Sequence, residues 1–300
     1  MKPSSEQKLT RFQNLDAYKE WTLAAADEVY QISRWGEGYF GVTEKGDMCV
    51  LPKKDMQGPR INIMEVVDEM KAKGIAFPAV IRFHDILRSQ VININKTFRS
   101  VIEEARFNGQ YMGVYPIKVN QMREVVDEIV DAGAPFNYGL EAGSKPELIA
   151  ALAMNTNQNS LTILNGYKDE DFLRLALLGN QLGRKVIVVV EKYSELLQLL
   201  ELSEKVGVEP MIGLRAKLAT KSTGKWAGSS GDYAKFGLTI PEIMQAVRHC
   251  KALGKEHCLK LFHFHIGSQI PDIRTIKDSI TEGARIFCKL VKEGAKLEYF

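Results

Sequence analysis

The chain has 300 residues, of which 45% are hydrophobic and 26% charged, and its formal charge is +3 at pH 7. A chain of this length and apolar content buries a large core, which excludes a disordered protein. Its 40 basic residues are spread along the sequence and are not gathered into a patch, so nucleic acid is not expected as a partner.

Two further features predict a cytoplasmic protein. The N-terminus lacks the apolar stretch of a signal peptide, and no apolar run reaches the roughly 18 residues that cross a membrane. The four cysteines show no C-x-x-C pair and no regular framework, which is typical of free thiols in a reducing compartment. We therefore expect no membrane partner.

Residues 1–105 are predicted to form an N-terminal extension. Residues 36–52 alternate between turn signals, which predicts a β-hairpin. Residues 61–74 have the spacing of an amphipathic helix, and residues 77–106 predict a strand followed by a long helix. We expect this extension to pack against a larger barrel domain and against a β-domain.

Residues 106–300 are predicted to form that larger domain. From about residue 111 the chain repeats a short apolar strand, a polar turn and an amphipathic helix that ends near a glycine. Alternation of this kind calls for a parallel sheet, either closed as a barrel or open and doubly wound. The predicted strands are 111–118, 136–141, 161–165, 185–190, 211–217 and 260–266.

The intervening helices carry start and stop signals. Ser144 is a predicted N-cap with Glu147 three residues later, the spacing of a capping box. The helix that follows the first strand is expected to stop at Gly133. Ser194 is the predicted N-cap of a later helix that ends at Gly207.

Polar residues at the ends of all six strands favour the barrel. In a barrel these ends converge on one mouth, where active sites are built. No G-x-G-x-x-G follows the first strand, which weakens the case for an open dinucleotide-binding sheet. The polar strand-end residues are Lys118, Asn120, Glu141, Asn165, Glu191, Arg215, His265 and Ser268.

The expected fold class is therefore α/β, a TIM-type (β/α)8 barrel that is incomplete in this sequence. Six strand–helix units are present, and residues 296–300 predict the start of a seventh strand. Because a barrel of this type has eight units, we expect these residues to be part of a longer polypeptide.

Lys118 has two interpretations. Strict strand alternation places it on the face shared by Val114, Pro116 and Asn120, directed into an apolar barrel. Desolvation there favours the unprotonated amine, the nucleophile that forms Schiff bases. Alternatively, the lysine lies at a strand end and extends its amine to water.

His263 and His265 lie on one face of the last strand and are followed by Gly267 and Ser268. The histidine pair is compatible with metal ligation, with an imidazole stacked on a flat cofactor ring, or with hydrogen bonding in the core. A small Gly-Ser loop favours an anion site, because it exposes backbone N–H groups and a hydroxyl. The pairs His249-Cys250 and His257-Cys258 also suggest a metal, but their spacing fits no standard motif.

Two further predictions concern the fifth strand. Arg215 at its end is a candidate partner for Glu141 across the barrel mouth, or else for a structural ion pair. The glycine- and serine-rich loop at 221–237 is long enough to be a functional lid or a binding loop.

Several long motifs resemble one enzyme family. They are "VYPIKVNQ", "GLEAGSKPEL", "NGYKDEDFLRLALLG", "LRAKLATKSTGKWAGSSGDYAKFGL" and "LFHFHIGSQIPDIR". From about residue 30 to the end, the sequence is similar to the biosynthetic arginine decarboxylases, pyridoxal-phosphate-dependent enzymes with an alanine-racemase-like barrel. The resemblance implies decarboxylation of L-arginine to agmatine and carbon dioxide, a step of polyamine biosynthesis.

The resemblance also implies roles for individual residues. Lys118 matches the lysine that binds pyridoxal 5'-phosphate as a Schiff base, and His265 the histidine that stacks on its ring; these are the expected catalytic residues. Glu141 and Arg215 match residues near the ring. The remaining matches are Gly267 and Ser268 at the phosphate, and Lys235, Phe236 and Gly237 in a turn of positional role.

Further expectations follow from the same resemblance. The rest of the barrel, with a glycine-rich phosphate loop and the acidic partner of the pyridine nitrogen, and the C-terminal β-domain are expected after Phe300, so this chain alone is expected to be inactive. A homo-oligomer, a dimer or a larger assembly of dimers, and dependence on Mg²⁺ are implied, with no ligand apparent in the sequence. The alternatives are an ornithine, lysine or diaminopimelate decarboxylase, a non-catalytic homologue that binds cofactor or a partner, and a metal-dependent hydrolase that uses His263 and His265.

Overall fold

The computed structural model describes residues 22–220 and 235–300, and the chain divides into two compact units at Gln90/Val91. This division lies inside helix α5 (His84–Glu104), whereas the sequence analysis drew the boundary after residue 105. The functional division into an extension and a barrel remains a prediction. Each unit is described by itself.

The first unit is built on a small antiparallel sheet. Strands β1 (Phe40–Val42) and β2 (Met48–Val50) form the predicted hairpin, and a short strand β3 (Ile61–Asn62), which the sequence did not reveal, pairs with β2. Residues 77–83, predicted as a strand, are not one. The helices are α2 (Leu23–Tyr30), α3 (Ile32–Trp35) and α4 (Ile63–Ala72), which Asn62 caps through its side chain.

The second unit contains a six-stranded parallel sheet whose order follows the chain, from β4 to β9. This confirms the predicted β/α-barrel architecture for the described part of the chain. The strands are β4 (Val114–Pro116), β5 (Gly139–Ala142), β6 (Leu161–Leu164), β7 (Lys185–Val190), β8 (Met211–Ala216) and β9 (Leu259–Phe264). Tyr299 forms an isolated parallel bridge to Leu261, so the last residues start to pair where a seventh strand was expected.

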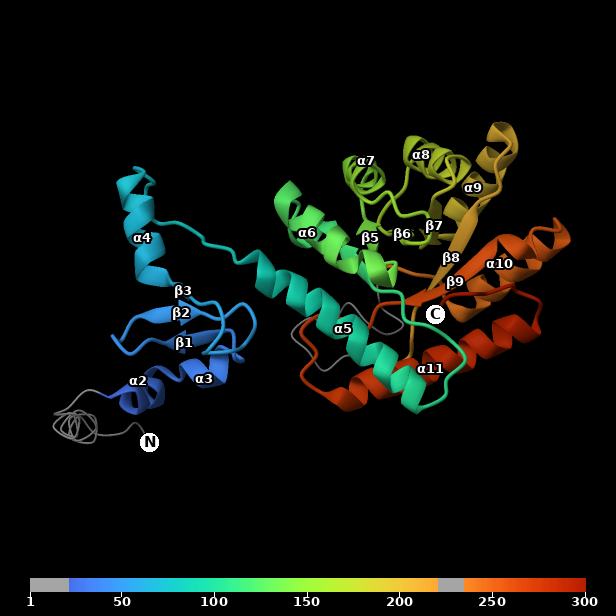
Figure 1. Ribbon diagram of the computed structural model, residues 1–300. Helices are drawn as coiled ribbons and strands as arrows, with labels where there is room; N and C mark the ends of the chain where they lie inside the picture. Colours follow the sequence, from blue (N-terminus) through green and yellow to red (C-terminus); the bar gives the residue numbers. More distant parts are fainter. Residues whose placement is uncertain (1–21, 221–234) are drawn as a thin grey trace, which may run out of the picture. The chain divides into compact units, whose positions relative to one another are not determined.

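Helices alternate with these strands, and α6 to α9 follow one another along one side of the sheet (Figure 1). The helices are α6 (Arg123–Gly133), α7 (Lys145–Met154), α8 (Glu170–Gln181), α9 (Tyr193–Val206), α10 (Ile240–Ala252) and α11 (Ile273–Lys292). Ser144 caps α7 as predicted, but α9 starts at Tyr193, with Lys192 and not Ser194 at its N-cap. No helix within the described ranges is both long and apolar enough to cross a membrane.

The sheet has apolar residues on both faces, as expected of a parallel sheet covered by helices. Alternate strand residues such as Val188, Leu214 and Phe262 pack with the helices in the main core. The other set forms a separate apolar cluster on the opposite, inner face, and its buried members are Leu161, Ile163, Ile187, Val189 and Leu261. The inner face of the sheet is therefore apolar and largely shielded from water below the strand ends.

Candidate active site

Charged residues lie at the carboxyl ends of the strands, in the same alternation as the inner apolar cluster. Glu141 is in register with Ile163 of that cluster, and Arg215 is in register with His263. Glu191 follows β7 two residues beyond Val189. Because successive side chains of a strand point to opposite faces, these residues share the inner face. These charged and polar groups therefore lie at the ends of β5, β7, β8 and β9, where the mouth was predicted.

Lys118 lies near this group but not on a strand. It is the central residue of a 3-10 turn, Ile117–Val119, that directly follows β4. Strict strand alternation was therefore the wrong basis for placing it. Its side chain is 62% exposed, so the expected desolvation is not present in this structure, and its Nζ lies 3.8 Å from Oε1 of Glu141. The amine is accessible and faces a carboxylate.

Glu141 is buried at the end of β5. Its Oε1 accepts a hydrogen bond of 3.2 Å from Nδ2 of Asn165, the residue after β6, and is also the atom nearest to Lys118. The other oxygen, Oε2, is buried and has no hydrogen-bond partner among the described residues, and the same holds for Oδ1 of Asn165. Buried polar atoms are nearly always satisfied in native proteins, by protein groups, water or ligands, so both atoms are available to a polar ligand or to water.

Arg215 pairs with Glu191 and not with Glu141, so the pairing across the mouth was wrong, whereas the alternative of a structural ion pair is what the structure has. Its Nη1 lies 2.6 Å from Oε1 of Glu191, and only 14% and 4% of the two side chains are exposed. The same oxygen accepts the backbone N–H of Gly166 at 3.3 Å. Glu191 ends the strand next to β8, whereas Glu141 ends a strand two positions farther along the sheet, which explains the choice of partner.

The two histidines have different surroundings. Burial, with the positive charges of Arg215 and Lys168 nearby, lowers the pKa of His263 to about 3, so this imidazole is neutral and its buried Nδ1 has no partner among the described residues. Partial burial and the charges of Arg215 and Lys118 also lower the pKa of His265. The Nδ1 of His265 accepts the backbone N–H of Gly267 at 3.0 Å. The flat imidazole of His265 at the strand ends has the shape to stack on an aromatic ring.

The predicted anion loop is only partly available for a ligand. The N–H of Gly267 is already used by His265, and this glycine has a φ of +109°, a conformation that side-chain-bearing residues rarely adopt. Ser268 is exposed, as its proposed contact with a phosphate requires. Most of the long loop predicted at 221–237, residues 221–234, lies outside the described residues. In its described end, the centre of the Phe236 ring lies 5.6 Å from the guanidinium carbon of Arg215.

Lys168 is a buried residue that the sequence analysis did not single out. It lies between β6 and α8, and its side chain has no exposed surface. Its Nζ donates to the carbonyl oxygens of Gly166 at 2.7 Å and Val189 at 2.6 Å. The signal that could have found it is a charged residue directly before a helix N-cap, here Asp169, which caps α8. That pattern is too common at helix starts to be specific.

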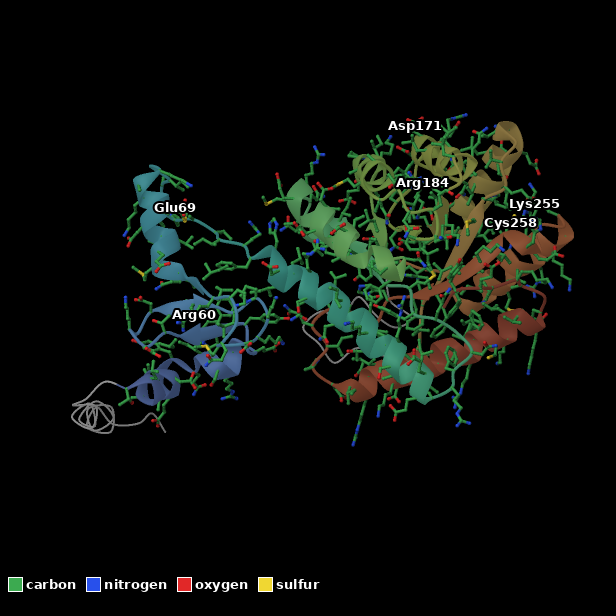
Figure 2. The ribbon with its side chains drawn as sticks, viewed as in Figure 1. Arg60, Glu69, Asp171, Arg184, Lys255 and Cys258 are labelled. Carbon is green, nitrogen blue, oxygen red and sulfur yellow. The ribbon has the colours of Figure 1, made fainter. Side chains whose placement is uncertain are left out.

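One group of possible metal ligands lies elsewhere. Glu209, His257 and Cys258 bring one ligand atom each within 4.8 Å of one another, whereas His249 and Cys250 belong to no such group among the described residues. The Cys258 thiol does not readily lose its proton to become a thiolate ligand, since burial raises its pKa to about 11. The group precedes β8 and β9, and Figure 2 shows Cys258 beside Lys255, which it contacts through its backbone. It is therefore at the opposite strand ends from Arg215 and His265.

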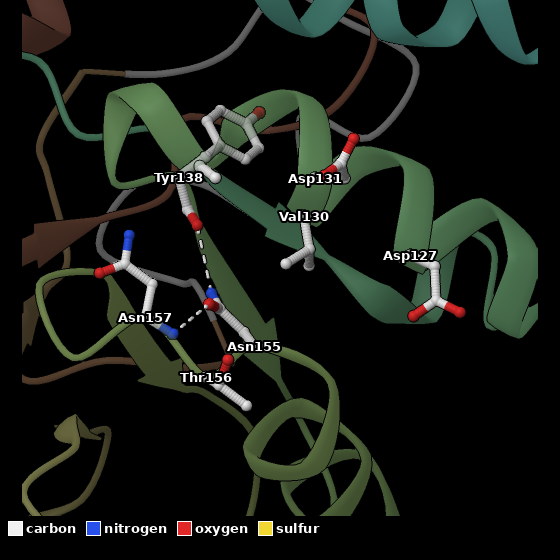
Figure 3. A pocket seen from close by; sticks show the side chains of 8 residues that line it. Asp127, Val130, Asp131, Tyr138, Asn155, Thr156 and Asn157 are labelled. Atoms are coloured by element: carbon white, nitrogen blue, oxygen red, sulfur yellow. Dashed lines mark hydrogen bonds between the residues drawn. The ribbon is translucent and has the colours of Figure 1, made fainter.

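A cavity of about 350 Å³ also lies away from the charged strand ends. It is lined by α6 and by the segments that precede β5 and β6, as Figure 3 shows for Asp131, Tyr138 and Asn155. Asn155 Nδ2 donates to the carbonyl oxygen of Tyr138 at 3.1 Å. These residues come from the amino-terminal side of the strands, so this cavity is not the predicted mouth.

Comparisons with known proteins agree with this geometry. Residues 91–300 match the model of the family described as "Pyridoxal-dependent decarboxylase, pyridoxal binding domain". A biosynthetic arginine decarboxylase from Gloeobacter violaceus is 44% identical over 281 residues, 94% of this chain and 44% of that protein. One from Phocaeicola vulgatus is 43% identical over the same shares. The chain thus spans less than half the length of the curated relatives it matches.

Solved structures give the same picture. The biosynthetic arginine decarboxylase SpeA from Campylobacter jejuni superposes with a TM-score of 0.79 at 32% identity, over 89% of this chain and 42% of that one. Diaminopimelate decarboxylase from Helicobacter pylori has a TM-score of 0.59 at 19% identity, over 79% of this chain and 55% of that one. At that identity the likeness concerns the fold alone.

Proposed function

Because this chain belongs to the family of pyridoxal-dependent decarboxylases, we propose that its charged strand ends bind pyridoxal 5'-phosphate and serve the decarboxylation of L-arginine to agmatine and carbon dioxide. The observation that carries the proposal is the convergence of Lys118, Glu141, Arg215 and His265 at one end of the parallel sheet. The activity is proposed for the enzyme as a whole, of which this chain supplies the strand-end residues.

The residues present fit the cofactor. Three buried polar atoms at the strand ends, Glu141 Oε2, Asn165 Oδ1 and His263 Nδ1, have no partner among the described residues, which supports a polar ligand above them. The donor set contains an accessible amine, a buried carboxylate and a guanidinium, all of which suit an aldehyde that carries a phosphate and a ring nitrogen. The apolar inner cluster below keeps water from the underside.

The chain's own residues have separate tasks in this scheme. Lys118 supplies the amine that attaches the cofactor, and its exposed position leaves that amine open to the aldehyde. Glu141, 3.8 Å away, balances the charge of the amine and orients it. His265 offers a flat ring for stacking, and Ser268 a hydroxyl for the phosphate. When bound, pyridoxal phosphate supplies the electron sink that accepts the electrons left by the departing carboxylate.

Arg215 keeps a positive charge near the mouth although it is paired. Its bond to Glu191 uses Nη1, and a guanidinium has five N–H donors in all. Its other donors make no hydrogen bond to the described residues, which supports a contact with an anionic group of the cofactor or of the substrate. The charge of Arg215 also contributes to the lowered pKa of His265. This supports a role for Arg215 near the ring.

Arginine is favoured as the substrate by the relatives. Those at 43–44% identity over most of this chain are biosynthetic arginine decarboxylases. Ornithine, lysine and diaminopimelate decarboxylases share the chemistry and remain the alternatives within the same class. A non-catalytic homologue that binds the cofactor or a partner is the alternative from another class.

Two measurements on the complete enzyme test the proposal. Borohydride reduction followed by peptide mapping is expected to give a phosphopyridoxyl adduct on Lys118. Absence of this adduct would exclude the proposed pyridoxal-phosphate-dependent activity. Release of carbon dioxide is then compared for L-arginine, L-ornithine, L-lysine and diaminopimelate at equal concentration. We expect the rate with L-arginine to exceed the rates with the others by at least about tenfold, since even one methylene changes the specificity by roughly 10- to 200-fold. A higher rate with another amino acid would change the substrate but keep the chemistry.

The remaining proposals concern context. We propose a homo-oligomer, which light scattering on the complete enzyme tests, and a cytoplasmic location in polyamine synthesis, which is supported by four free cysteines. Magnesium fits poorly, since it prefers six oxygen ligands. The group that the described residues offer, Glu209, His257 and Cys258, has one donor atom each of oxygen, nitrogen and sulfur. No step is derived through a metal.

A further inference from the structure

Lys168 lies in the connection between β6 and α8, fully removed from solvent. Its Nζ donates to Gly166 O at 2.7 Å and Val189 O at 2.6 Å, and lies 3.8 Å from Oε1 of Glu195. A buried lysine is costly unless it is paired and hydrogen-bonded. Two carbonyl oxygens accept hydrogen bonds from this amine, and the Glu195 carboxylate, beyond hydrogen-bond distance, adds a favourable charge. Burial lowers the pKa of Lys168, and the nearby carboxylates of Glu195 and Glu191 oppose that shift.

Glu195, in the first turn of α9, completes this arrangement. Its Oε1 accepts the backbone N–H of Lys168 at 3.3 Å, and its Oε2 accepts the backbone N–H of Glu191 at 2.9 Å. Only 4% of its side chain is exposed. Lys168 and Glu195 together, here called the buried pair, therefore join the end of β6, the end of β7 and the start of α9.

The buried pair determines where Glu191 lies. The backbone of Glu191 is held by Glu195, and its Oε1 accepts the N–H of Gly166, whose carbonyl oxygen is held by Lys168. The same Oε1 binds Arg215 at 2.6 Å. Among the described residues, the hydrogen bonds of Glu191 other than that with Arg215 thus go to Glu195 itself and to Gly166, which Lys168 holds.

Charge supports the same view. Lys168 and Arg215 carry two positive charges, and Glu191 and Glu195 carry two negative charges, so the four buried or nearly buried groups balance. Loss of Lys168 would leave two carboxylates to share the Arg215 guanidinium. The expected result is a shift of Arg215 away from the cofactor side of the strand ends.

We propose that Lys168, through Glu195 and Glu191, is a positioning residue that fixes the Arg215 guanidinium for the cofactor. This inference deepens the proposed function and rests on it. The alternative is that Lys168 and Glu195 form a buried ion pair that only stabilises the fold. The two explanations predict different cofactor affinities when both charges of the pair are removed.

The test compares the wild-type holoenzyme with Lys168→Met and Lys168→Met/Glu195→Gln. Lys168→Met leaves Glu195 buried and unpaired, so we expect a lower Tm. The double variant removes both charges, but glutamine accepts only one of the two backbone N–H groups that Glu195 holds, so its Tm is expected to recover in part. In both variants we expect roughly tenfold weaker binding of pyridoxal phosphate, as for lost outer-shell partners, and an altered pH dependence of its visible absorption band. Lys205→Ala, an exposed lysine paired with Glu201, is the control.

A double variant with wild-type cofactor affinity and absorption would overturn the inference, since the pair would then serve folding alone. If the double variant does not fold, Lys168→Met decides, and wild-type cofactor affinity and absorption in that variant would overturn the inference. If the wild-type enzyme itself binds no pyridoxal phosphate and releases no carbon dioxide from arginine, the proposed function fails, an outcome distinct from variants that match an active wild type.

Discussion

The Arg215 guanidinium binds the Glu191 carboxylate at 2.6 Å and joins the ends of the adjacent strands β7 and β8. Both side chains are nearly buried, and the Gly166 N–H is the other donor to the same oxygen. A nearly buried ion pair such as Arg215–Glu191 adds little net stability to the protein when it forms, but breaking it is costly because one charge is left without a partner.

Arg215→Met is therefore expected to destabilise the protein strongly. The predicted loss is about 3–5 kcal/mol, the cost of leaving Glu191 buried without a cation. Urea unfolding at pH 7 measures it. Arg174→Met is the control, since Arg174 and Glu170 form an exposed i,i+4 pair and its loss should cost less than about 1 kcal/mol. Equal losses for the two variants would contradict the assigned burial.

Lys118→Ala is expected to abolish decarboxylation while it leaves stability almost unchanged. The side chain is 62% exposed and its contact with Glu141 is 3.8 Å long, so its loss should change the free energy of unfolding by only about 0.5 kcal/mol. Lys205→Ala is a matched control, because Lys205 is 64% exposed and also pairs with a glutamate. Turnover near the wild-type rate in Lys118→Ala would refute the role of this amine.

His263 predicts a pH dependence of stability. Its folded-state pKa of about 3 lies below the ordinary value of 6.5, so below pH 6.5 the unfolded chain takes up a proton that the folded chain does not. His263 therefore has almost no effect on the free energy of unfolding above pH 7. As the pH drops from 6.5 towards 3, its effect lowers that free energy by about 1.4 kcal/mol per pH unit once the pH is well below 6.5. Between pH 7 and 5.5, the free energy of unfolding of His263→Gln, measured with urea, should fall by about 1 kcal/mol less than that of the wild type. Parallel losses in both proteins would show that His263 is not shielded.

Gly166→Ala is expected to be more harmful than Gly207→Ala. Both glycines have positive φ, +79° and +73°, so both substitutions carry the strain of that conformation, about 1 kcal/mol. A Cβ on Gly166 would also lie 2.7 Å from the carbonyl oxygen of Gly143, whereas a Cβ on Gly207 meets nothing within 4 Å. The difference in thermal stability between the two variants measures the steric part. An equal effect would mean that the loop after β6 can move aside.

The periodicity of the sequence was sufficient for the architecture. Apolar runs about 25 residues apart, separated by amphipathic helices with capping signals, predict a parallel sheet in chain order, and the structure has one. The same logic identified the strand ends as the polar edge, because parallel strands place all their carboxyl ends together. Motif resemblance, and not periodicity, pointed to the cofactor.

What the sequence by itself determined is the sheet, its order and the set of polar strand ends, since these follow from local patterns of side chains. Only the tertiary structure decided the partners. Arg215 binds Glu191 because adjacent strands bring these ends into contact, Lys118 leaves the strand alternation because the chain turns at Ile117, and Lys168 is buried because two carbonyl oxygens and Glu195 surround its amine. The contacts of Arg215 with Glu191, and of Lys168 with Val189 and Glu195, join residues more than 20 positions apart. No local pattern encodes which of several charged neighbours will be nearest once the strands are side by side.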